Sequence, residues 1–163
     1  MSIRRSLFGL VCATLCFLST SATASERFHQ PTQGNQFVST TDKYLYIVWS
    51  VPKDLAPFRG IASHAELDGF IARTALFLCH EHRASEPTQS KPCKVQVVRM
   101  NSNDEYTKSA AGGWKTIAEL VLARTHASDE AWKAALGLSL EQLKARFTSF
   151  DVKHERIALP SAG

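Results

Sequence analysis

Two cysteines constrain the fold of this chain more than any other feature. Cys79 and Cys93 flank a polar stretch, RASEPTQSKP, in which prolines and serines oppose regular structure. Because an even number of cysteines in an exported protein indicates a disulfide, we predict a bond between these two. It would close a loop of about 15 residues and add roughly 3 kcal/mol of stability in the chain-entropy model.

Residues 1–24 have the pattern of a secretory signal peptide. A basic segment, MSIRR, precedes an uncharged apolar run, SLFGLVCATLCFLSTS, and the small residues of ATAS follow. The run is too short to span a bilayer, so we expect cleavage after Ala24 and a periplasmic or secreted protein. Cys12 and Cys16 would leave with the signal, and neither follows a small residue, so we expect no lipid anchor.

The mature chain would carry little net charge. The sequence has 19 Lys plus Arg against 15 Asp plus Glu, a formal net charge of +4. Loss of Arg4 and Arg5 with the signal leaves 17 against 15, or +2. This small charge argues against binding to nucleic acid or to an anionic membrane. Residues 25–163 suit one domain with its own core.

A long amphipathic helix is predicted over residues 63–82. Ser63 is a suitable N-cap, and Glu66, three residues later, would complete a capping box. Cys79 lies near the helix end, so the disulfide would join this helix to the strand that follows. The apolar face recurs at spacings of three and four and comprises Leu67, Phe70, Ile71, Thr74, Leu78 and Cys79.

Three segments are predicted to be strands. Residues 44–51, YLYIVWSV, are apolar on both alternating faces, and CKVQVVRM, from Cys93, alternates in polarity. Residues 101–113 contain turn formers and two adjacent glycines, which indicates a long hairpin loop. Residues 114–124 fit either a strand or a helix, and the preceding glycines favour the strand. As a strand, one face would comprise Trp114, Thr116, Ala118, Leu120 and Leu122; as a helix, Trp114, Ile117, Val121 and Arg124.

Two short helices are predicted near the C-terminus. Ser128 would begin the first, DEAWKAAL, and Gly137 would end it. Ser139 and Gln142 form a capping box for the second, LEQLKARF.

These elements predict an α+β fold, a small two-layer sandwich. A three-stranded antiparallel sheet would carry a long crossover helix and one or two C-terminal helices on one face. Residues 43–153 would form the domain, after a flexible lead at 25–42 and before a loosely ordered tail at 154–163.

The motifs that resemble chemical sites have structural interpretations. His80 and His82 are two residues apart, so a helix would point them in different directions, and we expect a solvated helix end rather than a metal site. Ser63 and His64 are neighbours on a helix that face apart, so a cap is favoured over a catalytic pair. Neither GNQFVST nor AAGGWKT has the spacing of a phosphate-binding loop, and we expect no cofactor.

Five basic residues lie in or near the predicted hairpin. If they gather on one side of the sheet they would suit an acidic partner, although scattered lysines on an exposed face are commoner. They are Lys91, Lys94, Arg99, Lys108 and Lys115.

The hairpin loop is the candidate binding site. It is long, polar and hinged by glycines, and aromatic residues on a rigidly mounted loop are typical anchors of protein interfaces. For Trp114, packing in the core is the alternative. The candidate residues are Asp104, Glu105, Tyr106 and Trp114.

Two functions follow from these observations. We expect a non-enzymatic protein that binds another envelope or secreted protein, such as an accessory part of a secretion or transfer apparatus or an inhibitor of an envelope enzyme. The alternative is a small periplasmic hydrolase whose site is assembled from distant residues. Its general base would be His64, His80, His82 or His126.

Overall fold

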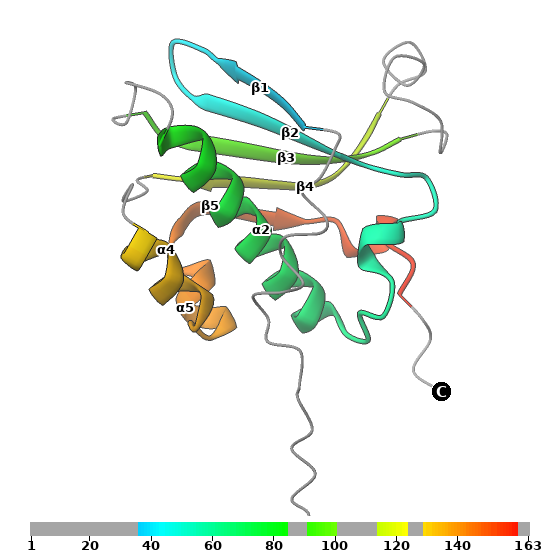
Figure 1. Ribbon diagram of the computed structural model, residues 1–163. Helices are drawn as coiled ribbons and strands as arrows, with labels where there is room; N and C mark the ends of the chain where they lie inside the picture. Colours follow the sequence, from blue (N-terminus) through cyan, green and yellow to red (C-terminus); the bar gives the residue numbers. More distant parts are fainter. Residues whose placement is uncertain (1–35, 85–90, 101–113, 124–128, 160–163) are drawn as a thin grey trace, which may run out of the picture.

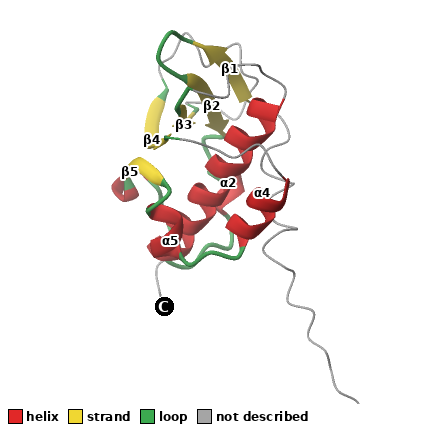
Figure 2. Ribbon diagram, turned by 90° about the vertical axis from the view of Figure 1, so that its left-hand side faces the viewer, coloured by secondary structure: helices red, strands yellow, loops and turns green. Residues whose placement is uncertain are grey.

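Five strands and three helices make up most of the computed structural model, which describes residues 36–84, 91–100, 114–123 and 129–159. The fold is α+β, as predicted, with the helices on one face of a single mixed sheet (Figure 1; Figure 2). The predicted signal peptide lies outside the described residues. The elements are β1 (Gln36–Thr40), β2 (Leu45–Val51), η1 (Ala56–Phe58), α2 (His64–Ala84), β3 (Cys93–Arg99), β4 (Lys115–Leu122), α4 (Asp129–Leu136), α5 (Leu140–Lys144), β5 (Phe147–Val152) and η2 (His154–Arg156).

The sheet has five strands in chain order, β1-β2-β3-β4-β5. β2 and β3 pair in parallel, whereas the other neighbouring strands pair antiparallel. The expected three-stranded antiparallel sheet is therefore wrong. The reason lies in α2, which carries the chain back to the end of the sheet where β2 began, so that β3 must run in the same direction as β2.

Strand β1 was not expected, because the sequence analysis assigns its residues to a flexible lead. Gln36–Thr40 instead form a hairpin with β2. The backbone N–H of Thr41 donates to the carbonyl of Tyr44 at 2.9 Å, and the N–H of Tyr44 donates to Oγ1 of Thr41 at 3.0 Å. Pairing with β2 therefore orders a segment that is too polar to indicate a strand by itself.

Strand β5 was also missed. The predicted helix LEQLKARF reaches Phe147, whereas α5 ends at Lys144 and Phe147 begins a strand on the outer edge of β4. The predicted capping box is confirmed: Oγ of Ser139 accepts from the N–H of Gln142 at 3.3 Å, and Oε1 of Gln142 accepts from the N–H of Ser139 at 3.0 Å. Thus the start of this helix was predictable and its end was not.

Helix α2 is confirmed, and it ends at Ala84, two residues beyond the predicted end at residue 82. Oγ of Ser63 accepts from the N–H of Glu66 at 3.1 Å, which establishes Ser63 as a cap. The carboxylate of Glu66 accepts from the N–H of Ala62 at 3.1 Å. The predicted apolar face lies in or against the core, where Leu67, Ile71, Thr74, Leu78 and Cys79 are all completely buried.

Helices α4 and α5 pack beside α2, and Arg73 of α2 joins them to it (Figure 2). Its Nη2 donates to the carbonyl of Leu138 at 3.0 Å, in the turn between the two short helices. A Cβ at Gly69 would lie 2.8 Å from Nη1 of Arg73, so the glycine leaves room for this side chain to cross the helix. Burial lowers the pKa of Arg73.

Strand β4 is confirmed, although one predicted face is not continuous. The register with β3 shifts between Val97 and Val98, and Ile117 is the extra residue. Ala118 pairs with Val97 on the helix side, whereas Thr116 pairs with Val98 on the open face and accepts a hydrogen bond from Nε2 of Gln96 at 2.7 Å. The bulge therefore puts Thr116 and Ala118 on opposite faces.

The segment after β5 is more ordered than the expected loose tail. Residues His154–Arg156 form the short helix η2, and the N–H of Lys153 donates to the carbonyl of Ile117 at 2.8 Å. Ile157 is 5% exposed and belongs to the core. This segment therefore runs along the start of β4, where it helps to form the pocket described below.

Candidate functional site

The predicted disulfide is present at the end of the sheet where β2 and β3 begin. Cys79 and Cys93 are joined with an S–S distance of 2.04 Å and a Cα–Cα distance of 6.0 Å. Both residues are completely buried between α2 and the sheet. The bond therefore fixes the last turns of α2 to the first residue of β3 and has a structural position.

Basic side chains at this disulfide end bond to backbone carbonyls. Arg83, 1% exposed, donates from Nη2 to the carbonyl of Lys91, and Nζ of Lys91 donates to the carbonyl of Thr41 at 2.8 Å. Burial lowers the pKa of Arg83. These two cations thus hold together α2, the chain entering β3 and the β1–β2 turn.

The two strand ends that flank the predicted binding loop lie at the opposite end of the sheet. β3 ends at Arg99 and β4 begins at Lys115, so the chain between them leaves and returns at this end. Asp104, Glu105 and Tyr106 lie outside the described residues. Trp114, directly before β4, is half-buried.

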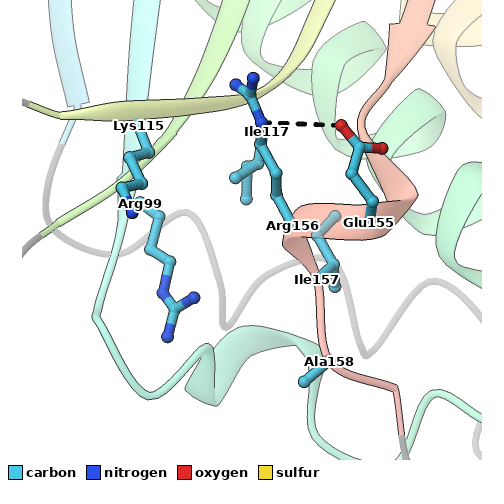
Figure 3. A pocket seen from close by; sticks show the side chains of 7 residues that line it. All are labelled: Arg99, Lys115, Ile117, Glu155, Arg156, Ile157 and Ala158. Carbon is cyan, nitrogen blue, oxygen red and sulfur yellow. Dashed lines mark ion pairs between the residues drawn. The ribbon is translucent and has the colours of Figure 1, made fainter.

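A pocket of about 340 Å³ opens at this same end, between the start of β4 and the segment after β5 (Figure 3). Its floor is apolar, with Ile117 and Ile157, and three of its lining residues are cationic and one anionic. The lining comprises Arg99, Lys115, Ile117, Glu155, Arg156, Ile157 and Ala158. Its size is at the low end of the range for ligand sites, roughly 300–1,000 Å³.

The charges of the pocket are unequally compensated. Nη1 of Arg156 donates to the carbonyl of Thr116 at 2.6 Å, and its Nε lies 3.6 Å from Oε1 of Glu155. Arg99 donates from Nε to the carbonyl of Lys53 at 2.8 Å, which fixes its guanidinium. Within the described part of the chain, neither the terminal nitrogens of Arg99 nor the ammonium of Lys115 has a hydrogen bond or ion pair.

Of the five basic residues considered for a cationic patch, the structure brings two together. Arg99 and Lys115 meet in the pocket, whereas Lys91 lies at the disulfide end. Lys94 lies on the open face of the sheet, where Nζ is 2.8 Å from Oε1 of Glu119, and this hydrogen bond raises the pKa of Lys94. Lys108 lies outside the described residues.

A second cluster surrounds the buried carboxylate of Asp68. Oδ1 accepts from Nε2 of His154 at 2.7 Å, and Oδ2 lies 2.8 Å from Nζ of Lys144. The ring of His64 stacks on that of His154, with 4.3 Å between the centroids and 5° between the planes. The cluster joins α2, α5 and η2. Of the histidines proposed as a general base, it contains His64.

Two of the remaining predicted histidines are described, and both lie near the end of α2, away from this cluster. Nε2 of His82 is 3.0 Å from Oε1 of Gln36, so this ring connects α2 to edge strand β1. His80 is half-buried on the same helix, and His126 lies outside the described residues. Within the described ranges, no three His, Cys, Asp or Glu side chains gather in a way that could hold a metal ion.

Sequence reasoning missed His154, Glu155 and Arg156, because it assigned them to a loose tail. A signal was present in the sequence: a short apolar run, IAL from Ile157, directly follows four polar residues, KHER, and apolar residues near a terminus can hold that segment against the core. Both the pocket and the Asp68 cluster depend on this segment.

The comparisons with known proteins supply no family. No family model, curated protein or solved structure matches the chain. Among the described residues, no helix has both the length and the apolar character needed to cross a membrane.

Proposed function

We propose that this chain is an exported, disulfide-stabilised protein that acts by binding another envelope or secreted protein. The observation that supports the proposal is the position of the two strand ends that flank the candidate loop. Its two ends are Arg99 and Lys115, which pair across the centre of the sheet and also line the pocket. A partner that contacted the loop would therefore also meet a fixed, cationic surface.

The mounting of the loop suits this role. β3 and β4 are inner strands of the sheet, because β2 pairs with the other edge of β3 and β5 pairs with the other edge of β4. Rigid strands that present a long connection are a common arrangement for recognition, because the scaffold limits the entropy that binding costs. Tyr106 would supply an aromatic anchor, and Asp104 and Glu105 would supply polar contacts.

Export would suit the disulfide, because such bonds form and persist in oxidising compartments and are rare in the cytosol. A periplasmic or secreted location is accordingly part of the proposal. Partners that share this location include components of a secretion or transfer apparatus and envelope enzymes.

Site-directed photocrosslinking in the native cells tests the proposed function. A photoreactive residue at Tyr106 should give a dominant crosslinked species, identified by mass spectrometry. The matched control is the same residue at Lys43, which is exposed in the β1–β2 turn at the disulfide end. The same species from both positions, or none from Tyr106, would contradict the proposal.

A hydrolase is the second candidate, and the Asp68 cluster is the observation that favours it. A buried carboxylate that orients a histidine is a recurring part of hydrolytic sites, and His64 lies directly against that histidine. However, Lys144 binds the same carboxylate, so the cluster also has the composition of a structural contact between three elements. Hydrolysis of ester and peptide substrates that disappears in both His64→Gln and His154→Gln would establish the second candidate.

A further inference from the structure

The pocket at the loop end brings two positive charges together, and no acidic side chain among the described residues forms an ion pair with either of them. Arg99 and Lys115 are direct cross-strand partners in the register of β3 and β4. Like charges at directly opposite positions of a sheet are unfavourable. Figure 3 shows both side chains extending from the strands on the same side, beside the apolar floor.

The other two charged residues of the pocket, Arg156 and Glu155, carry opposite charges and lie close together. Arg156 is bonded to the backbone of β4 and lies near Glu155, whose side chain is 69% exposed. This leaves the charges of Arg99 and Lys115 as an excess of about two positive charges in a small, half-enclosed space. A bound anion would remove this repulsion.

The geometry at Arg99 favours a carboxylate. Its Nε is used by the carbonyl of Lys53, which holds the guanidinium in one orientation and leaves the two terminal nitrogens for a ligand. Guanidinium and carboxylate match as planar groups that form paired hydrogen bonds, and a neighbouring ammonium adds a third donor.

The rest of the pocket favours a carboxylate that belongs to a peptide. Ile117 and Ile157 form an apolar floor beside the cations, and a volume of about 340 Å³ holds one or two side chains. An acidic side chain with an apolar neighbour would use both parts of the lining.

We propose that the pocket formed by Arg99, Lys115, Ile117 and Ile157 receives an acidic side chain and an adjacent apolar side chain from an extended segment of the partner protein. The proposal rests on the proposed function, since it names the chemistry of the partner at the same end of the sheet.

Nuclear magnetic resonance titration of the purified protein tests this inference with two probes. One is a short, terminally blocked peptide with a glutamate between two isoleucines, and the other has glutamine in place of the glutamate. The glutamate peptide should shift the amide signals of Arg99, Lys115, Ile117 and Ile157. The glutamine peptide should bind at least about tenfold more weakly, because it lacks the charge-assisted bonds.

Variants locate the effect. Arg99→Gln and Lys115→Gln should each lower the affinity for the glutamate peptide about tenfold. The control, Lys133→Gln, makes the same charge change on the exposed side of α4 and should leave this affinity unchanged. Lys115→Gln removes one of two like charges, so it should not lower the midpoint of thermal unfolding. With the midpoint unchanged, a loss of binding in this variant does not result from unfolding.

Three outcomes would overturn the inference. Equal affinity for the two peptides would show that the pocket does not recognise a carboxylate. An absence of shifts at the pocket residues would show that the peptide does not bind there. If inorganic phosphate or acetate bound as tightly as the glutamate peptide, the pocket would be a site for small anions and not for a partner protein.

Failure of the proposed function would look different. If Tyr106 captured no partner and the glutamate peptide still bound, the pocket chemistry would stand and the protein-binding role would not. If a partner were captured equally well by wild type and by the Arg99→Gln Lys115→Gln chain, the partner would stand and the inference would be wrong.

Discussion

The two ends of the sheet use positive charge in opposite ways. At the disulfide end, Arg83 is buried and bonds to the carbonyl of Lys91, whose own ammonium bonds to the carbonyl of Thr41. At the loop end, Arg99 and Lys115 stand opposite each other beside an open pocket. The first arrangement stabilises the fold, and the second adds a repulsion that no anion in the described part of the chain relieves. This difference indicates which end of the molecule is available for binding.

Among the predicted changes, loss of the disulfide should lower the stability of the protein most. Cys79→Ala with Cys93→Ala should lower the free energy of unfolding by about 3 kcal/mol, because the unfolded chain is no longer constrained. Urea denaturation of wild type under oxidising and reducing conditions provides the matched control. An unchanged unfolding midpoint, or free thiol in the oxidised wild-type protein, would show that the bond does not stabilise the native fold.

Truncation of Arg83 should rank second. Arg83→Ala removes a fully buried side chain together with its bond to the carbonyl of Lys91, and we expect a loss of about 2 kcal/mol in urea denaturation. Arg83→Met keeps most of the volume and removes a desolvated charge, so it should lose less. If Arg83→Ala and Arg83→Met lost equal free energy of unfolding, the packing of this side chain would not contribute to stability. Neither variant should change the affinity for the glutamate peptide.

The Asp68 cluster should have an intermediate effect. Asp68→Asn weakens two charge-assisted contacts of a buried carboxylate, to His154 and to Lys144, and should cost about 1–2 kcal/mol of stability. Asp151→Asn is the control, because its pair with Lys153 is about half exposed and should be worth little. If Asp68→Asn unfolded like wild type but lost a hydrolytic activity, the cluster would be catalytic and not a structural contact.

The smallest change in stability is expected in the pocket. Lys115→Gln should alter the free energy of unfolding by no more than about 0.5 kcal/mol, and in the stabilising direction, because a cross-strand repulsion is removed. A clear loss of stability in thermal or urea unfolding would show that Lys115 has a structural role, as the cations at the disulfide end do.

Local pattern was sufficient to predict much of the fold. The spacing of Leu67, Ile71 and Leu78 predicted α2, the composition of the stretch between Cys79 and Cys93 predicted a closed loop, and Ser139 with Gln142 predicted a helix start. Each of these signals lies within a few turns of the chain, where sequence spacing translates directly into shared faces.

What was missed depends on contacts between distant segments. β1 and β5 are short edge strands with polar residues, and they are ordered by pairing with β2 and β4 rather than by their own composition. The parallel pairing of β2 with β3 follows from the direction in which α2 returns the chain.

The candidate site was predicted only in part for the same reason. The loop could be recognised from its glycines and aromatics, but the pocket joins Arg99 and Lys115 through the strand register and adds Ile157 from the segment after β5. The sequence places Arg99 and Lys115 among five basic residues near the hairpin, but no spacing shows which of them meet, and the expectation of a loose tail removed Ile157 from consideration.

One measurement compares the two ends directly. The affinity for the partner captured through Tyr106 would be determined for two chains with the same charge change, Arg99→Gln Lys115→Gln at the loop end and Lys43→Gln Lys91→Gln at the disulfide end. We expect a loss of affinity of about a hundredfold for the first chain and of no more than about twofold for the second. Equal affinities in the two chains would contradict the assignment of the loop end as the binding end.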